Sequence, residues 1–302
     1  MLRWFGIFLI LTATAFAGIV EDVRGSLAQS NFSSAESELK SYKAKMGVTP
    51  EYLEALSWMG RAALEMQQYS QAQSYAKQTL AAATPLLQKR KLDAEPQLPI
   101  AVGAALEVQA LSLAAQGQKA QGVALLRRSL QTYGNSSIAA RLHKNLNLLT
   151  FVGQAAPVLK TTEYLGAKPA SATQLKGSPQ LLFFWAHWCA DCKGEGPILA
   201  RLRSEFSELT IIAPTQRYGY AAHGDEATPQ AERSYIESVW QQYYSGLQGV
   251  SVPLGKDNFN VYGASTTPTL VLIDRSGKIA FYHPGALPYE ELRAAIQKVV
   301  RG

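Results

Sequence analysis

Two cysteines are the residues of this sequence with the clearest chemical potential. Cys189 and Cys192 lie in the stretch LLFFWAHWCADCK and are the only cysteines among 302 residues. At this spacing they could form a redox pair, half of a metal site or a structural staple. The structural staple is the weakest of these interpretations, because a disulfide that closes so short a loop restricts the unfolded chain little. A zinc site needs further ligands, but there is no third cysteine and the histidines are scattered. The pair is therefore predicted to be redox-active, with no metal or organic cofactor.

The segments around the pair suit this chemistry. QLLFFW (180–185) has the length and the continuous hydrophobicity of a buried strand, and residues 190–206 have a helical pattern. Cys189 would then stand at a helix N-terminus, where backbone amides and the positive dipole end favour its thiolate. Cys192, one turn deeper, could attack a mixed disulfide formed at Cys189.

Two ionisable residues next to the thiols have opposite expected effects. A protonated His187 would lower the pKa of Cys189, whereas the negative charge of Asp191 would raise it. His187 could also be an exposed residue without influence on the pair. The sequence therefore marks both residues as candidates for tuning the site and leaves the direction open.

Strand and helix patterns alternate after residue 153, which predicts an α/β domain with a mixed central sheet flanked by helices. A hairpin turn, DRSG, separates the last two strand patterns. The expected strands cover 180–185, 209–213, 269–273 and 278–283, and the expected helices cover 190–206, 231–244 and 289–300.

Residues 18–152 have a helical pattern instead, rich in Ala, Leu and Gln. Small residues and leucines recur at matching places in 53–84 and 103–134, as in a helix-turn-helix unit of about 34 residues. Small residues such as Ala110 and Gly122 would let antiparallel helices approach closely. These segments resemble tetratricopeptide repeats, in a degenerate form with a long loop expected over 86–100. A generic helical bundle is the alternative.

The N-terminus, MLRWFGIFLILTATAFAG, has the features of an export signal over residues 1–17. Arg3 precedes an apolar run, and Ala15 and Ala17 suit a cleavage site. An uncleaved anchor and an ordinary buried helix are the alternatives. No later stretch is expected to cross a membrane. We therefore expect an exported, periplasmic protein that is soluble after cleavage, with domains at 18–152 and 153–302.

Charge gives no support for a nucleic-acid partner. The chain has 29 Lys and Arg against 23 Asp and Glu, a net charge of +6. Its densest basic run, QKRK (88–91), is short and has no aromatic residues between the basic ones. A solvated surface explains such a run, so no nucleic-acid partner is expected.

Residues 153–302 resemble the thioredoxin superfamily, and within it the TlpA/ResA-like branch of exported thiol-disulfide oxidoreductases. The motif WAHWCADCK (185–193) carries most of the resemblance. Further matches are GQAAP (153–157), Glu195 and Pro197 in the expected active-site helix, Thr267-Pro268 in ASTTPTLVLIDRSGK, and Gly285 after the last strand.

The resemblance implies roles for several of these residues. Pro268 would be a cis proline beside the cysteines, and Thr267 would touch the substrate; an ordinary trans proline is the alternative. Trp188 would shield the site and line the substrate groove, or else pack in the core. Glu195 would help to deprotonate Cys192, or be a solvated helix residue. Because Phe183 stands where thioredoxin has a buried aspartate, Glu195 is the nearest candidate for that role.

The function implied by the resemblance is reduction of disulfides in exported proteins, with electrons from a membrane electron-donor protein. One alternative reverses the direction, as in a disulfide oxidase or isomerase. Another is a redox-sensing adaptor whose helical repeats bind a peptide or protein partner. The Tyr-rich segment 215–244 is expected to pack over the sheet or to shape a partner surface near the active site.

Overall fold

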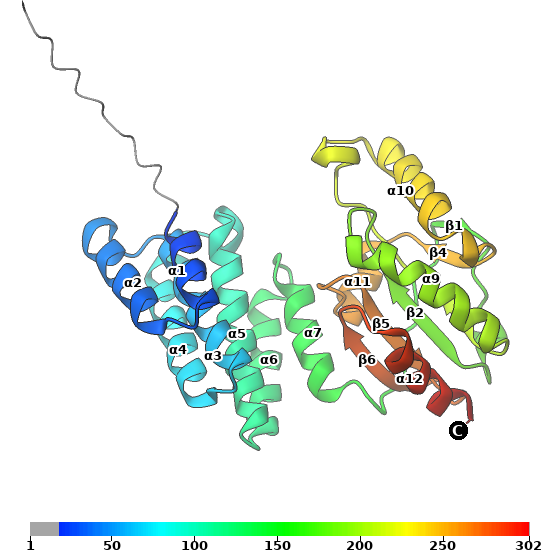
Figure 1. The fold of residues 1–302 in the computed structure, drawn as a ribbon, viewed down its shortest axis with the longest axis horizontal. Helices are drawn as coiled ribbons and strands as arrows, with labels where there is room; N and C mark the ends of the chain where they lie inside the picture. The colour runs from blue at the N-terminus through cyan, green and yellow to red at the C-terminus, as the bar shows by residue number, and fades with distance from the viewer. Residues whose placement is uncertain (1–17, 302) are drawn as a thin grey trace, which may run out of the picture. The chain divides into compact units, whose positions relative to one another are not determined.

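The structure is a computed structural model that describes residues 18–301 (Figure 1). The predicted signal over 1–17 lies outside these residues. The chain forms two compact units, of which the first ends at Ala104 and the second begins at Ala105. This division falls inside a helix, so the boundary expected after residue 152 stays a prediction about sequence segments.

Antiparallel helices build the first unit. Helix α1 packs against α2 and α3, and α3 packs against α4. Two of these helices begin at side-chain caps, since Asn31 accepts a hydrogen bond from the backbone N–H of Ser34 and Thr49 accepts one from Tyr52. The predicted helical hairpins are confirmed, whereas their identity as tetratricopeptide repeats stays a prediction. The helices are α1 (Ile19–Ala28), α2 (Phe32–Met46), α3 (Pro50–Glu65) and α4 (Tyr69–Leu87).

Helix α5 (Gln97–Ala115) follows the short 3-10 helix η1 (Leu92–Ala94), so the loop expected over 86–100 is shorter than predicted. Helix α5 is long and apolar enough to cross a membrane, contrary to the expectation for this part of the sequence, but more than half of its apolar window is buried. It packs closely with α6 (Lys119–Tyr133): a Cβ atom on Gly122 would lie 2.6 Å from the carbonyl oxygen of Ala110. The expected role of small residues at this helix crossing is confirmed.

A mixed six-stranded sheet forms the centre of the second unit, in the order β1-β4-β3-β2-β5-β6. Strand β2 pairs in parallel with β3 and antiparallel with β5. The two strands without a sequence prediction, β1 and β4, have three residues each, too few to show a periodicity. The strands are β1 (Tyr164–Gly166), β2 (Gln180–Phe184), β3 (Thr210–Ile212), β4 (Ser251–Pro253), β5 (Thr269–Ile273) and β6 (Ile279–Pro284).

Both faces of the sheet are buried, which explains the continuous apolar run of β2. Leu181 and Phe183 pack with α9, α10 and α12 on one face. Leu182 and Phe184 point to the opposite face, where they pack with α11. The elements around the sheet are α8 (Ala172–Leu175), α9 (Ala190–Glu205), η2 (Ala222–Gly224), α10 (Pro229–Tyr243), η3 (Ser245–Leu247), α11 (Lys256–Tyr262) and α12 (Tyr289–Arg301).

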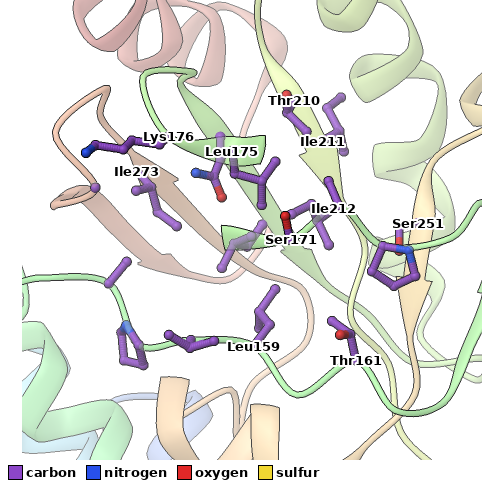
Figure 2. A pocket seen from close by; sticks show the side chains of 18 of the residues that line it. Leu159, Thr161, Ser171, Leu175, Lys176, Thr210, Ile211, Ile212, Ser251 and Ile273 are labelled. Atoms are coloured by element: carbon purple, nitrogen blue, oxygen red, sulfur yellow. The ribbon is translucent and has the colours of Figure 1, made fainter. Parts of the chain in front are cut away.

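The face of the sheet opposite α9 also carries a pocket of about 740 Å³. Leu159 lines it from a loop, Leu175 from α8, and Ile212 and Ile273 from the sheet (Figure 2). The cysteine pair does not line this pocket. It is therefore separate from the redox chemistry described below.

Helix α7 (Ala139–Thr150) packs against α11 and β6 of the sheet domain. The Asn147 side chain donates a hydrogen bond to the carbonyl oxygen of Tyr262 at 3.0 Å. Phe151, directly after the helix, makes edge-to-face contacts with Tyr262 and Tyr282. The last helix of the helical region is thus fixed to the domain that carries the cysteines.

Candidate active site

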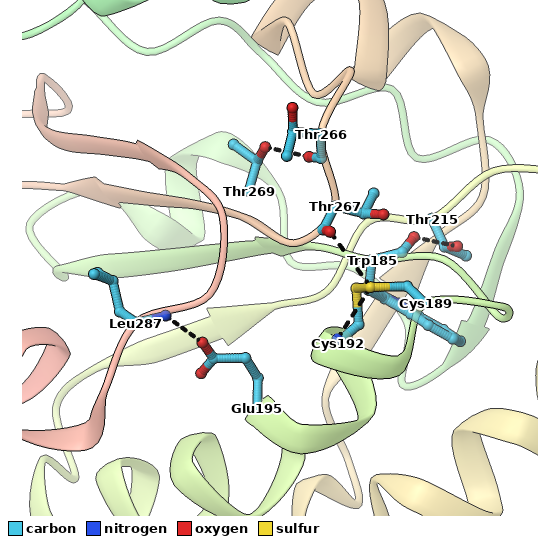
Figure 3. The surroundings of a disulfide bond; sticks show 9 residues. All are labelled: Trp185, Cys189, Cys192, Glu195, Thr215, Thr266, Thr267, Thr269 and Leu287. Carbon is cyan, nitrogen blue, oxygen red and sulfur yellow. Dashed lines mark hydrogen bonds between the residues drawn. A yellow bond between two sulfur atoms is a disulfide. The ribbon is translucent and has the colours of Figure 1, made fainter. Parts of the chain in front are cut away.

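Cys189 and Cys192 form a disulfide at the start of α9 (Figure 3). The S–S distance is 2.12 Å and the Cα atoms are 5.3 Å apart. Cys189 is the N-cap residue of α9, and its sulfur accepts a hydrogen bond from the backbone N–H of Cys192 at 3.0 Å. The helix N-terminus therefore contacts the Cys189 sulfur directly, as the sequence predicts, and would stabilise a thiolate there.

The two sulfurs differ in how a substrate could reach them. Cys189 keeps 4% of its surface exposed, whereas Cys192 is fully buried. The Cys189 sulfur also lies 3.4 Å from the carbonyl oxygen of Thr267. Cys189 is therefore the sulfur that an incoming disulfide would meet first, and Cys192 is placed to act on it from inside.

The loop before β5 faces this disulfide. The peptide bond between Thr267 and Pro268 is cis, as expected. The loop is held at both sides, because Thr269 donates its hydroxyl to the Thr266 carbonyl at 2.6 Å and Gly285 donates its N–H to the Pro268 carbonyl at 2.8 Å. The hydroxyl oxygen of Thr267 is buried without a hydrogen-bond partner in the structure.

Trp188 is the most accessible large side chain of the motif, with 49% of its surface exposed. The interpretation of Trp188 as a core residue is therefore wrong. Its ring meets the ring of Tyr218 edge to face, with centroids 5.6 Å apart. An exposed aromatic ring next to a reactive sulfur offers an apolar contact to a substrate.

His187 is buried, so its interpretation as an exposed residue is wrong. Its Nε2 atom lies 3.3 Å from a carboxylate oxygen of Glu232, and its ring meets three tyrosine rings edge to face at 5.3–5.6 Å. Burial lowers the pKa of His187, and Glu232 opposes this shift only in part. The lowered pKa favours the neutral imidazole, which gives no positive charge to Cys189.

Glu232 was not singled out by the sequence analysis. It is buried on α10, and besides meeting His187 it accepts hydrogen bonds from the backbone N–H groups of Tyr218 and Gly219. The available sequence signal was its place on the helix face of Ile236 and Trp240, both buried. Glu232 ties the 215–224 loop to the active-site motif.

The segment 215–244 packs over the sheet, which was the simpler expectation. Trp240 and Tyr244 stack at 4.7 Å and both rings contact Trp185. Two hydrogen bonds hold Trp185 in place. Its indole N–H donates to the Ala213 carbonyl at 3.1 Å, and its own carbonyl accepts from the Thr215 hydroxyl at 2.8 Å. These contacts fix the strand end that leads into the cysteine pair.

Glu195 is buried and does not lie on a solvated helix face. One carboxylate oxygen accepts a hydrogen bond from the backbone N–H of Leu287 at 2.7 Å, and the other has no partner in the structure (Figure 3). Burial raises the pKa of Glu195, and the charge of the exposed Asp191 adds to this shift. Glu195 lies one helical turn beyond Cys192, on the same side of α9.

The raised pKa of Glu195 predicts a pH-dependent stability. Since the folded state favours the protonated carboxyl, stability should fall as the pH rises from the usual carboxyl range through the raised pKa. In Glu195→Gln the amide oxygen can keep the bond from Leu287, and this loss should disappear. Urea unfolding at intervals from pH 4 to 8 would measure it. Parallel profiles for wild type and variant would contradict the assignment.

No group of three or more His, Cys, Asp or Glu side chains within residues 18–301 is arranged to hold a metal ion. The buried His187 and Glu232 are paired with each other. What the site can do chemically rests on the two sulfurs, the helix N-terminus and the buried carboxyl of Glu195.

Comparisons with known proteins agree with this geometry. Residues 168–300 match the family model of the thioredoxin-like domain. A thiol:disulfide interchange protein DsbE of Xylella fastidiosa is 32% identical over 117 residues, which are 39% of this chain and 52% of the relative. A thiol-disulfide oxidoreductase ResA of Bacillus anthracis is 26% identical over 148 residues, which are 49% of this chain and 78% of the relative.

The comparison with solved structures gives low sequence identities. A thiol-disulfide isomerase from Corynebacterium glutamicum has 17% sequence identity and a TM-score of 0.41, covering 49% of this chain and 97% of that one. The chain spans about half the length of the DsbE relatives. The matches are confined to the part of the chain that holds the mixed sheet and the cysteine pair. The C-terminal half of this chain therefore carries a thioredoxin-like domain, related to the ResA and DsbE proteins.

Proposed function

We propose that this protein is an exported thiol-disulfide oxidoreductase that reduces disulfides of exported proteins through Cys189 and Cys192. The observation that carries the proposal is the disulfide at the N-terminus of α9, with one partly accessible and one buried sulfur. The relatives named DsbE and ResA support the same class of activity. The cysteine pair itself holds the two electrons, so the reaction needs no other cofactor.

The burial of His187, which lowers its pKa, favours the reducing direction. A strongly oxidising pair needs a thiolate that is unusually stabilised in the reduced form. A protonated histidine two residues before Cys189 could supply such stabilisation, but burial lowers the pKa of His187. The helix N-terminus is left as the main stabilising contact of the Cys189 sulfur, and we infer a reductant.

The proposed reaction has two exchange steps. The Cys189 thiolate attacks one sulfur of a client disulfide, which breaks that bond, forms a mixed disulfide and releases the other client sulfur as a thiol after protonation. Cys192 then loses its proton and attacks the Cys189 sulfur, releasing the second client thiol. The client gains two electrons and two protons, and the enzyme is left as the observed disulfide.

Glu195 is proposed as the proton acceptor for Cys192. It is buried within one turn of that cysteine, and its raised pKa brings it closer to the range in which a carboxylate can exchange protons with a thiol. Trp188 and Thr267 are proposed to contact the client, since the first is half exposed and the second lies against the Cys189 sulfur. Asp191, exposed in the first turn of α9, is proposed to tune the site by its charge.

We also propose how the whole chain is organised and how the enzyme is recharged. Residues 1–17 are proposed to be a cleaved export signal, 18–152 a tetratricopeptide-like helical domain and 153–302 the redox domain. The oxidised enzyme would be returned to the dithiol by a membrane electron-donor protein. Arg3 before an apolar run supports export, and the paired antiparallel helices support a repeat-like domain.

The reduction potential of the cysteine pair tests the direction of the reaction. We expect a value at or below about −230 mV on equilibration with glutathione buffers, in the range of reductants such as thioredoxin at about −270 mV. A value near about −120 mV, as in a strong oxidant, would refute the reductant and favour a disulfide oxidase. The matched variant His187→Asn should leave the potential nearly unchanged, because the lowered pKa of His187 already favours the uncharged imidazole.

A further inference from the structure

A groove of about 440 Å³ lies next to the cysteine pair, within the second unit. Trp188 and Thr267 line it on the side of the active site. Another part of the lining comes from the segment where α6 ends and α7 begins, through Gly134, Asn135, Ser136, Ser137, Ala139 and Ala140. Residues of the helical region, more than 40 positions before the cysteines, therefore form a wall of a cavity at the redox site.

The groove leads to the reactive sulfur. Thr267 lines it, and the carbonyl oxygen of Thr267 lies 3.4 Å from the sulfur of Cys189. Trp188, 49% exposed, lines it directly before Cys189 in the chain. A molecule in the groove would therefore lie within reach of the accessible sulfur.

The chemistry of the lining fits a polypeptide segment. Asn135, Gln216 and Asn260 offer amide groups that can both donate and accept hydrogen bonds, as the backbone of an extended peptide requires. The Thr267 hydroxyl is a buried group without a protein partner at the same place. Lys256 is the one charged side chain of the lining, which favours uncharged or acidic segments over basic ones.

The wall from the helical region is held firmly in place. Arg141 and Lys144 of α7 both form ion pairs with Glu107 of α5, at 2.6 and 3.1 Å. These two cations lower the pKa of Glu107 to about 2 against the opposing effect of its burial. With Asn147 bonded to the carbonyl of Tyr262 at the end of α11, α7 is held by both α5 and α11, and a binding surface on it is pre-organised.

We propose that residues 134–140 are part of the client-binding surface, and that the groove holds an extended segment of a disulfide-bearing polypeptide with uncharged or acidic side chains near its cysteine. The inference rests on the proposed function and adds a role for the helical region, which selects the segment that Cys189 attacks. A small disulfide can reach Cys189 without filling the groove. The groove therefore affects polypeptide clients and not small disulfides.

The test uses the pre-reduced full-length protein and three disulfides. Two are disulfide-linked peptide dimers that differ only in having two Asp or two Lys residues beside the cysteine, and the third is hydroxyethyl disulfide. The variants are Asn135→Trp, which fills the groove from an exposed position, and Lys256→Glu, which reverses its charge. Gln131→Trp, exposed on α6 outside the groove, is the matched control. Second-order rate constants of protein oxidation are measured by tryptophan fluorescence.

We expect wild type to react about threefold faster with the acidic than with the basic peptide, since one exposed charge has a modest effect. Lys256→Glu should invert this preference. Asn135→Trp should slow both peptides about tenfold and leave hydroxyethyl disulfide within about twofold of wild type, as expected for lost groove contacts. Gln131→Trp should change none of the rates.

Peptide rates in Asn135→Trp and Lys256→Glu equal to those of the control would overturn the inference. An equal slowing of hydroxyethyl disulfide would also overturn it, because the change would then act on the cysteines themselves. If Asn135→Trp does not fold, the charge preference in Lys256→Glu decides alone. Wild type inert toward all three disulfides would refute the proposed function instead, so the two failures are distinguishable.

Discussion

Cys189→Ser is expected to lose the reduction of insulin disulfides, by on the order of a thousandfold or more, because a hydroxyl cannot replace the thiolate nucleophile. Cys189 is the cysteine with exposed surface and with the helix N-terminus at its sulfur. The measurement is the rate of insulin precipitation with a chemical reductant present. No thiol outside the pair can replace the nucleophile, since Cys189 and Cys192 are the two cysteines of the sequence.

Cys192→Ser is the matched control for this result. It retains the nucleophile and lacks the resolving thiol, so it should accumulate a mixed disulfide with insulin that is visible on non-reducing gels. The reverse pattern, with trapping by Cys189→Ser and none by Cys192→Ser, would mean that the roles are exchanged. Unchanged turnover in Cys189→Ser would show that the pair is not the redox centre.

Gly263→Ala is expected to lower the melting temperature of the second unit by roughly 6–12 °C. The added Cβ would clash with the backbone nitrogen of Lys144 and lie 2.7 Å from the carbonyl carbon of His143, both in α7. A clash with backbone cannot be relieved by a side-chain rotation, so α7 and α11 must move apart. Overpacking and a left-handed backbone at φ 63° together cost about 3 kcal/mol, and about 1 kcal/mol corresponds to 2–4 °C for a unit of this size.

Gly277→Ala separates the two causes. Gly277 also has a positive φ, 81°, but a Cβ there would meet no atom within 4 Å. Its substitution should cost only the backbone strain, about 1 kcal/mol, or roughly 2–4 °C. Differential scanning calorimetry would measure both variants. Equal losses in the two would show that the close packing of α7 on α11 contributes nothing to stability.

The redox pair and its local setting were predictable from the sequence. A continuous apolar run, two cysteines three apart and a helical pattern are all local features, and they place Cys189 at a helix N-terminus without knowledge of the rest. The longer strands and helices were predictable for the same reason. Strands β1 and β4 were missed, because each has three residues and their pairing joins segments about 90 positions apart.

The burial of His187 and the resulting shift of its pKa could not be predicted from the sequence. Its partner Glu232 is 45 positions away, and the two meet only because α10 packs over the sheet end that carries the motif. Burial then lowers the pKa of the imidazole, since desolvation depends on everything that packs around a group and not on its neighbours in the chain. The burial of Glu195 against Leu287, 92 positions away, has the same origin.

Chain order thus supplied the nucleophile, the resolving thiol and the elements that hold them. Tertiary packing decided which ionisable groups are desolvated, which sulfur is accessible, and that the turn before α7 lines the cavity beside Thr267. The physical reason is the separation along the chain of the residues that interact. Helix and strand patterns and the spacing of two thiols reflect forces between near neighbours in the chain, whereas burial and cavity shape arise from contacts between segments that the sequence keeps far apart.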